Sequence, residues 1–141
     1  MAVNVLAIKD KVQRYLIDLF GSAKVDRDGD FVLKSGSSTC YVSIKAWGDE
    51  STIVRIFSLT NREVPASPEL FDFVANSSYY FGNLFCKKKD SVVTVYFAHS
   101  LLGEFLDPDE FRTALLMVGQ TADELDDQIK AKFGGKLFGE E

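Results

Sequence analysis

The spacing of apolar side chains predicts a helix at each end of the chain. Over residues 4–20 they recur at three- and four-residue steps with polar residues between them, and Gly21 follows as a helix end. The same periodicity runs over residues 107–133. There Asp107 can cap the helix and Pro108 fits its first turn, where a missing N–H group costs nothing.

A third, shorter helix is predicted in the middle of the chain. Ser67 is a typical capping residue, Pro68 follows it, and Glu69 suits the positive end of the helix dipole. Apolar residues then form one stripe, and we expect this helix to end near Tyr79 or Tyr80. Each of the three predicted helices has one apolar face to bury.

Runs of alternating apolar and polar residues predict the strands of a sheet. The first two strands flank Asp28-Gly29, a dipeptide that favours a two-residue hairpin turn. Four further strands are expected at residues 39–47, 52–60, 84–88 and 92–100. Because short connections join consecutive strands, the sheet should be mostly antiparallel. The fold class is α+β, with the order helix, hairpin, two strands, helix, two strands, helix.

Length and composition fit one folded unit. A chain of 141 residues with 46% hydrophobic and 26% charged residues has an ordinary globular composition. At this size about two-thirds of the unfolded surface is buried on folding, which supports one core. We expect a single α+β domain at residues 1–135, followed by a frayed tail at residues 136–141.

Charge and the chain start narrow the classes of partner and compartment. The formal net charge is −5, whereas nucleic-acid-binding proteins present a basic face, so we expect no nucleic acid as a partner. The first residues lack the features of a signal peptide, and no apolar run is long enough for membrane insertion. Cys40 and Cys86 are interpreted as buried free thiols. These features indicate a cytoplasmic protein.

No catalytic, metal or cofactor site is predicted. His99 is the only histidine, and neither a G-x-S-x-G turn nor a set of zinc ligands accompanies it. The acidic stretch around Asp28 resembles a calcium loop, but Phe31 and Ser37 stand where such a loop needs glycine and glutamate. No glycine-rich loop opens a helix in the way that a phosphate-binding cofactor requires. We therefore expect a protein that is not an enzyme.

Two charged clusters have ordinary explanations. The lysine run at residues 87–89 lies next to a predicted turn, where it is solvated and can protect a strand edge against mispairing. Asp123, Glu124, Asp126 and Asp127 are interpreted as a solvated face of the last helix. The alternative for these carboxylates is docking of a basic partner segment.

The predicted sheet carries apolar groups on both faces. A sheet with one wet face shows a clean alternation of apolar and polar residues, and the strands at 52–60 and 92–100 do not. If the helices cover only one face, another copy of the chain or a partner segment has to cover the other. The alternative is that the middle helix closes the second face within one chain. The predicted partner-binding residues are Tyr41, Trp47, Val54 and Ile56.

Three stretches carry a family resemblance. They are the strand Val54–Thr60 with the helix start at Ser67, the hairpin from Asn83 to His99, and the ending Ala122–Gly135. Together they resemble the type III secretion chaperone fold, and in particular the YbjN-like peptide-binding chaperones of bacteria. The resemblance spans nearly the whole chain and implies a small, non-enzymatic, often homodimeric protein. Such secretion chaperones hold an extended segment of a client protein along apolar grooves.

Two functions from different classes stay open. The first is a homodimeric chaperone or adaptor that grips a segment of a client protein, with a regulatory role in signalling as another form of it. The second is a small-ligand sensor or enzyme with a pocket lined by Tyr79, Tyr80, Phe81 and Tyr96. The sequence favours the first, because such a pocket lacks convergent polar groups with defined roles.

Overall fold

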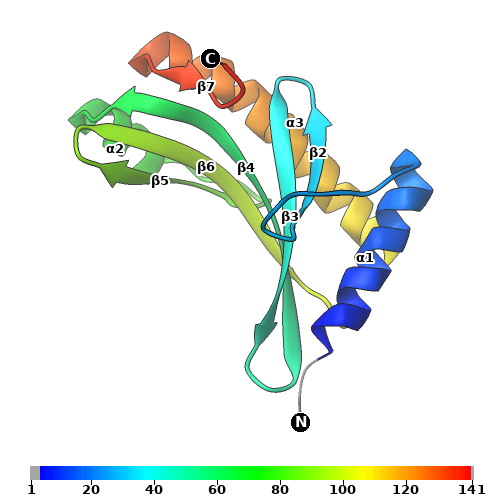
Figure 1. Cartoon of the computed structure of the whole chain (residues 1–141). Coiled ribbons are helices and arrows are strands. Elements are labelled where there is room, and N and C mark those ends of the chain that lie inside the picture. Colours follow the sequence, from blue (N-terminus) through cyan, green and yellow to red (C-terminus); the bar gives the residue numbers. More distant parts are fainter. Residues whose placement is uncertain (1–3, 141) are drawn as a thin grey trace.

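The structure is a computed structural model that describes residues 4–140 (Figure 1). The helices are α1 (Val5–Phe20), α2 (Pro68–Ala75) and α3 (Pro108–Phe133). The strands are β1 (Lys24–Val25), β2 (Phe31–Ser35), β3 (Ser38–Trp47), β4 (Ser51–Pro65), β5 (Asn83–Lys89), β6 (Val92–Leu102) and β7 (Lys136–Leu137). Helices at both ends and in the middle, with strands between them, confirm the predicted α+β class.

The strands form one twisted sheet in the order β1-β2-β3-β4-β6-β5 (Figure 1). All of its strand pairs are antiparallel, as the short connections predict. Strand β3 pairs with β4 from Ser51 to Ser58, and β7 pairs with β4 further along, at Asn61 and Arg62. Because β6 pairs with the other edge of β4, β3 and β7 pair with the same edge of β4, one after the other.

The helices begin where the capping signals predict. The side chain of Ser67 accepts a hydrogen bond from the backbone N–H of Leu70 (3.1 Å) at the start of α2. The side chain of Asp107 accepts one from the N–H of Glu110 (2.7 Å) at the start of α3. Gly21 ends α1 with φ at 81°, a left-handed conformation that glycine adopts without strain.

Helix α2 is shorter than the periodicity predicts. It ends at Asn76, whose backbone N–H bonds the carbonyl of Asp72, and not near Tyr79 or Tyr80. The chain turns away from the helix and Tyr79 places its ring against the edge of Phe97, with 5.1 Å between ring centroids. This tertiary contact outweighs the local preference to continue the helix.

The first hairpin is confirmed, but its turn is longer than predicted. Val25 pairs with Phe31, so five residues connect the strands in place of the two of the Asp-Gly turn. The carboxylate of Asp26 accepts hydrogen bonds from the backbone N–H groups of Asp28 (2.9 Å) and Asp30 (3.0 Å). An aspartate that bonds its own loop in this way favours the wider turn.

Strand β4 extends through residues 61–65, which the sequence predicts as a loop. Its register with β6 shifts on both sides of Asn61, and Glu63 adopts a positive φ of 54°. Such a bulge keeps the pairing while it re-aims side chains. The amide of Asn61 points to α3 and donates a hydrogen bond to the backbone carbonyl of Asp126 (2.9 Å).

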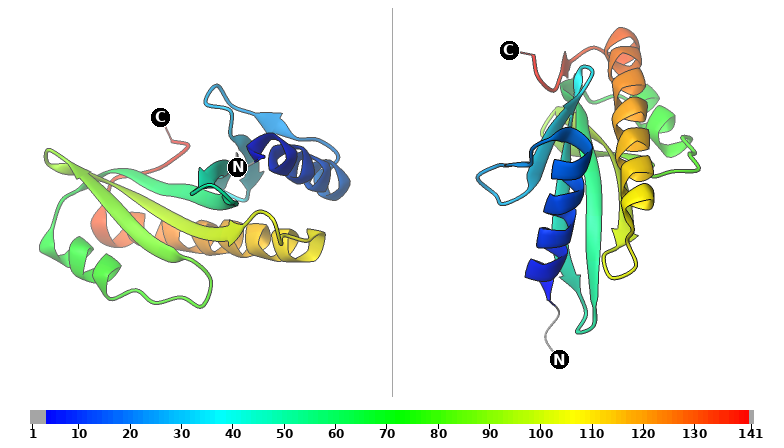
Figure 2. Two further views of the ribbon diagram at one scale, coloured as in Figure 1. Left: turned by 90° about the horizontal axis from the view of Figure 1, so that it is seen from below. Right: turned by 90° about the vertical axis from the view of Figure 1, so that its right-hand side faces the viewer.

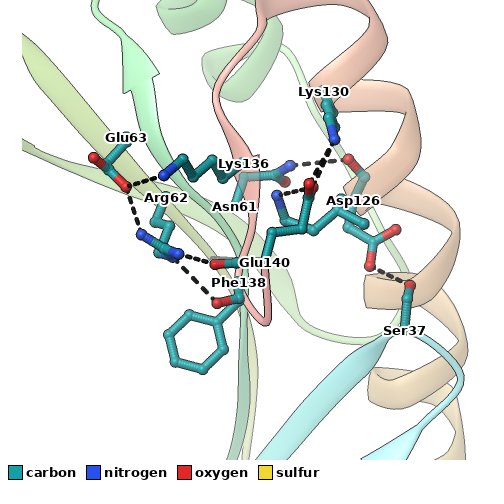
Figure 3. Close-up of polar contacts among 10 residues, drawn as sticks. Ser37, Asn61, Arg62, Glu63, Asp126, Lys130, Lys136, Phe138 and Glu140 are labelled. Atoms are coloured by element: carbon teal, nitrogen blue, oxygen red, sulfur yellow. Dashed lines mark hydrogen bonds and ion pairs between the residues drawn. The ribbon is translucent and has the colours of Figure 1, made fainter.

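The end of the chain packs against β4, where the sequence predicts a frayed tail (Figure 3). Lys136–Leu137 forms β7, and the guanidinium of Arg62 donates to the backbone carbonyls of Phe138 and Glu140. The ammonium of Lys130 pairs with the carboxylate of Glu140 at 2.7 Å. The described part of the predicted tail is therefore held in place, and Glu141 lies outside the described residues.

All three helices cover the same face of the sheet. Helix α3 packs along β4 and β3, α1 packs against β3 and α3, and α2 packs against β5. In the left view of Figure 2, α2 and α3 lie on the same side of the strands. The largest fully buried side chains between the helices and this face include Phe97, Phe111, Ile56, Leu70 and Ile129. One face of the sheet is therefore the core face.

Two carboxylates of α3 hold the tip of the β2–β3 hairpin. The hydroxyl oxygen of Ser37 lies 2.6 Å from a carboxylate oxygen of Asp123 and 2.6 Å from one of Asp126. One hydroxyl hydrogen serves only one of them. Burial raises the pKa of Asp126, whereas hydrogen bonds from Ser37 lower the pKa of Asp123. A protonated Asp126 can donate to Ser37, which then donates to Asp123. Because both carboxylates contact the hairpin, this part of the acidic cluster is not a solvated face.

We expect Asp126→Asn to stabilise the fold at pH 7 by on the order of 1 kcal/mol, because its amide supplies the hydrogen that an ionised Asp126 lacks. A carboxyl whose pKa is raised by folding favours the folded state more as the pH falls through its folded pKa. In urea unfolding, the wild type should therefore gain on the variant between pH 7 and pH 3.8, the ordinary pKa of aspartate. Exposed Asp127→Asn is the control. Equal stability of Asp126→Asn and wild type at both pH values contradicts this assignment.

Candidate functional site

The other face of the sheet, which we term the open face, consists of strand residues whose side chains point away from the helices. Directly opposed residues of antiparallel strands share a face, so the register assigns them. Its central members are Tyr41, Ser43, Lys45 and Trp47 of β3, Ile53, Arg55, Phe57 and Leu59 of β4, Tyr96, Ala98, Ser100 and Leu102 of β6, and Phe85 and Lys87 of β5. Within residues 4–140, no helix packs on this face (Figure 2).

The structure separates the four predicted partner-binding residues. Tyr41 and Trp47 lie on the open face, and Trp47 is 69% exposed. Val54 and Ile56 point to the core face and are 0% exposed. Their burial corrects the prediction, because residues sealed under the helices cannot line a surface of the folded chain.

The length of one turn explains this error. Trp47 pairs with Ser51, so the β3–β4 loop has three residues, 48–50. A four-residue turn, as the sequence suggests, would oppose Trp47 to Thr52 and bring Val54 and Ile56 to the side of Tyr41. Because side chains alternate along a strand, one residue in the loop moves a whole strand to the other face.

A hollow of about 660 Å³ lies on the open face, between the β3–β4 and β5–β6 halves of the sheet. Apolar side chains from all four strands line it, among them Trp47, Ile53, Phe57, Phe85 and Tyr96. Phe85 and Tyr96 stack with 5.0 Å between ring centroids. The hollow is within the usual volume range of ligand sites, but it is open to one side, as a groove for a chain segment would be.

A second hollow, of about 400 Å³, lies at the other end of the open face. Asp30 and Phe57 line both hollows, so the two adjoin each other on this face. Tyr41 stacks on Phe57 at 5.3 Å and receives the edge of Phe138 at 6.4 Å. The end of the chain therefore covers part of the open face with one aromatic ring.

Three of the four aromatic residues of the alternative pocket lie together, but the fourth lies on the other face of the sheet. Tyr79, Tyr80 and Phe81 line a hollow against α3 on the helical side, and Tyr80 is fully exposed. Tyr96 lies on the open face, stacked on Phe85. The small-ligand pocket predicted from these four residues is therefore not formed.

Burial shifts the pKa values of His99 and Cys40, two side chains of types that can act in catalysis. Burial lowers the pKa of His99, whose ring packs against Phe81 with 4.9 Å between centroids. Burial also raises the pKa of the Cys40 thiol to about 12, so this thiol is not a nucleophile at neutral pH. Both residues are explained by packing.

Within residues 4–140, no three histidine, cysteine, aspartate or glutamate side chains are grouped so that they could hold a metal ion. None of the helices described combines the length and the apolar character needed to cross a membrane.

Sequence reasoning missed several members of the open face. Phe57, Phe85, Arg55 and Lys87 line the larger hollow but were not predicted as partner-binding residues. The signal for Phe57 and Arg55 is their position on the other alternation of β4 from Val54. That signal becomes readable only when the three-residue loop is recognised.

The solved structures that share this fold include YbjN of E. coli and the Yersinia pestis chaperone SycH. YbjN of E. coli matches with a TM-score of 0.58 at 14% sequence identity, over 86% of this chain and 90% of that one. The Yersinia pestis type III secretion chaperone SycH, crystallised with a stable fragment of YscM2, matches with a TM-score of 0.50 at 10% identity, over 84% and 98%. At these identities the similarity concerns the fold alone. No curated protein matches the chain in sequence.

The fold and the open face define a small α+β protein of the secretion-chaperone architecture. The family "T3SS (YopN, CesT) and YbjN peptide-binding chaperone 1" matches residues 7–141. The chain therefore belongs to this family, TY-Chap1, and the resemblance seen in the sequence is confirmed. The family indicates a role in binding polypeptide.

Proposed function

We propose that this chain is a chaperone or adaptor that holds an extended segment of a client protein against the open face. The observation that carries the proposal is the set of large apolar side chains from four strands that no described helix covers. A contiguous apolar surface of this kind on a soluble chain marks an interaction site. Membership in a family of peptide-binding chaperones supports a polypeptide as the occupant.

Two features of the open face suit an extended chain segment. The larger hollow can receive side chains between Phe57, Phe85 and Tyr96, and Trp47 offers a large exposed anchor at its rim. Strand β5 is at the edge of the sheet, so its outer backbone groups can pair with a client strand. The lysine run at residues 87–89 lies on this edge, where it protects the free chain against mispairing.

The same proposal includes a homodimer that works in the cytoplasm. Exposed Tyr80 and partly exposed Met117, on the helical side, support a second apolar contact surface. Cys40 and Cys86 are both free, which supports a reducing compartment.

We expect a random library of twelve-residue peptides, panned on the immobilised full chain, to yield enriched binders. Trp47→Ala and Tyr96→Ala should each weaken these peptides by about tenfold or more in fluorescence anisotropy, because aromatic anchors at interface centres typically contribute about 2 kcal/mol or more. Phe105→Ala removes an exposed aromatic side chain that lines neither hollow of the open face, and it should leave the affinity unchanged.

Failure of the library to yield any enriched peptide contradicts the proposal. Enriched peptides that bind Trp47→Ala and Tyr96→Ala as tightly as wild type also contradict it, because the open face would not be their site. Sedimentation equilibrium of the free chain tests the dimer, with an expected mass of twice 15.7 kDa.

A further inference from the structure

Charge is divided between the two faces of this molecule. The chain has 21 acidic and 16 basic residues, so a random surface would be acidic. Yet outside the β4 bulge at residues 61–64, the open-face positions that the register assigns in β1 to β6, in the part of the chain described, include six basic residues and no acidic one. These are Lys24, Lys34, Lys45, Arg55, Lys87 and Lys89. The acidic residues lie in the helices and loops, with Glu63 in the β4 bulge as the exception.

Three of these cations line the larger hollow together with its aromatic residues. They are Lys45, Arg55 and Lys87, and Asp30 is the one carboxylate among the lining residues. Burial and the nearby Asp26 raise the pKa of Asp30, and Lys45 opposes this shift. The carboxylate of Asp30 therefore partly compensates Lys45, whereas Arg55 and Lys87 form no ion pair with a carboxylate within residues 4–140.

Arg55 lies in the middle of the sheet, and its guanidinium forms no ion pair within the described part of the chain. Its opposed neighbours on the open face are Ser43 and Ser100, which are too small to cover it. Its guanidinium carbon lies 5.3 Å from the centroid of the Phe85 ring, and Lys87 Nζ lies 5.4 Å from that of Tyr96. The ion pairs found within residues 4–140 involve Arg62, Lys130 and Lys136 and none of the cations of the hollow. The rings orient both cations, and their N–H groups stay available to a partner.

We propose that the larger hollow selects client segments in which acidic side chains alternate with aromatic or aliphatic ones. This inference rests on the proposed function and names the chemistry of the client. A carboxylate can form two parallel hydrogen bonds to Arg55, and the neighbouring apolar side chains of the segment pack on Phe85, Tyr96 and Phe57. The acidic helices repel such a segment from the rest of the surface, which restricts it to the open face.

The charge at the far end of the open face distinguishes a polypeptide ligand from a polyanionic one. The loop at residues 26–30 brings Asp26, Asp28 and Asp30 to the smaller hollow, with Arg27 as the only basic residue of its lining. A nucleic acid strand that follows the face would carry its phosphates into these carboxylates. A polypeptide can be acidic at the Arg55 end and neutral or basic at the Asp26 end. The aromatic and basic lining therefore favours a peptide of mixed charge over single-stranded nucleic acid.

The test reads the charge of the peptides enriched on the full wild-type chain. We expect them to carry aspartate or glutamate next to aromatic or aliphatic residues, more often than the starting library does. Synthetic copies with each acidic residue replaced by lysine should bind roughly tenfold or more weakly, and high salt should weaken the parent peptides. The double variant Arg55→Gln/Lys87→Gln should lose roughly tenfold or more in affinity for the parent peptides and should discriminate less against their lysine copies.

A matched control removes the same charge elsewhere. Arg14→Gln/Arg112→Gln also loses two positive charges, but both residues are exposed on helices, so parent peptides should bind as to wild type. Thermal unfolding checks that both double variants fold.

Four results would overturn the inference. Enriched peptides without an acidic bias would do so and leave the proposed function standing, whereas an absence of enriched peptides would contradict both. If both double variants weakened peptide binding equally, the loss of affinity would come from the change in net charge and not from the cations of the hollow. Tighter binding of a fluorescent oligo-dT strand than of the peptides, lost in Arg55→Gln/Lys87→Gln, would assign the hollow to nucleic acid. A dimer that dissociates in that variant alone would assign it to a second copy of the chain.

Discussion

Ile56→Asp is expected to unfold the domain. Ile56 is 0% exposed at the centre of β4, under α3, and aspartate there would put a charge among apolar side chains. Burial of an unpaired charge costs several kcal/mol, in addition to the packing that the isoleucine loses. Small domains are stable by only about 5–15 kcal/mol. The purified variant should therefore lack the far-UV circular dichroism and cooperative thermal transition of the wild type.

Ile53→Asp, three residues earlier, is the matched control. Ile53 lies on the open face, lines the larger hollow and is only partly buried, so an aspartate there remains in contact with water. This variant should fold and should bind the enriched peptides more weakly. A folded Ile56→Asp chain with wild-type stability would mean that β4 has the opposite orientation, and the open face would have to be redrawn.

The helices show how much of this fold is readable from local sequence. A capping side chain fixes a helix start through one hydrogen bond to a backbone N–H two or three residues away, so Ser67 and Asp107 could be assigned without tertiary information. The end of α2 could not, because the contact of Tyr79 with Phe97 joins parts of the chain that are distant in sequence. Starts are set locally, whereas this end is set by packing.

The candidate site shows the same limit in the sheet. Alternation within each strand was assigned correctly, so Tyr41 and Trp47 were found together, as were Val54 and Ile56. Alternation does not say which face of one strand matches which face of the next, because the loop between them decides it. With the three-residue loop at 48–50, Tyr41 pairs with Phe57 and shares its face, whereas Ile56 points to the other face. Two of the four predicted residues therefore lie on the open face, and the other two lie in the core.

The end of the chain was mispredicted for a related reason. Residues 136–141 include one glycine and two glutamate residues and show no clear periodicity, a composition typical of frayed ends. The order of residues 136–140 comes from Arg62 and from the part of β4 that β3 leaves unpaired, and neither is visible in the tail itself. The bulge that exposes this edge also turns Asn61 toward α3.

Phe97→Ala is the second variant with a large expected effect, a loss of about 3–5 kcal/mol in the free energy of unfolding. Phe97 is 0% exposed on the core face of β6, opposite Leu84 of β5. Its ring meets Tyr79, and a Cβ at Gly82 would lie only 2.9 Å from it, so the ring fills the space under residues 76–82. Alanine would leave a cavity there and remove the main contact of this segment.

Phe105→Ala makes the same chemical change on the surface, since Phe105 is 80% exposed, and it should shift stability by less than about 0.5 kcal/mol. Urea unfolding followed by far-UV circular dichroism compares the two variants, and an unchanged slope with denaturant would show that the native state stays compact. Phe97→Ala should also increase proteolysis within residues 76–82, because Tyr79 loses its partner. Equal midpoints for the two variants would mean that the ring of Phe97 does not support the core, and the division of β6 between a core face and an open face would fail with it.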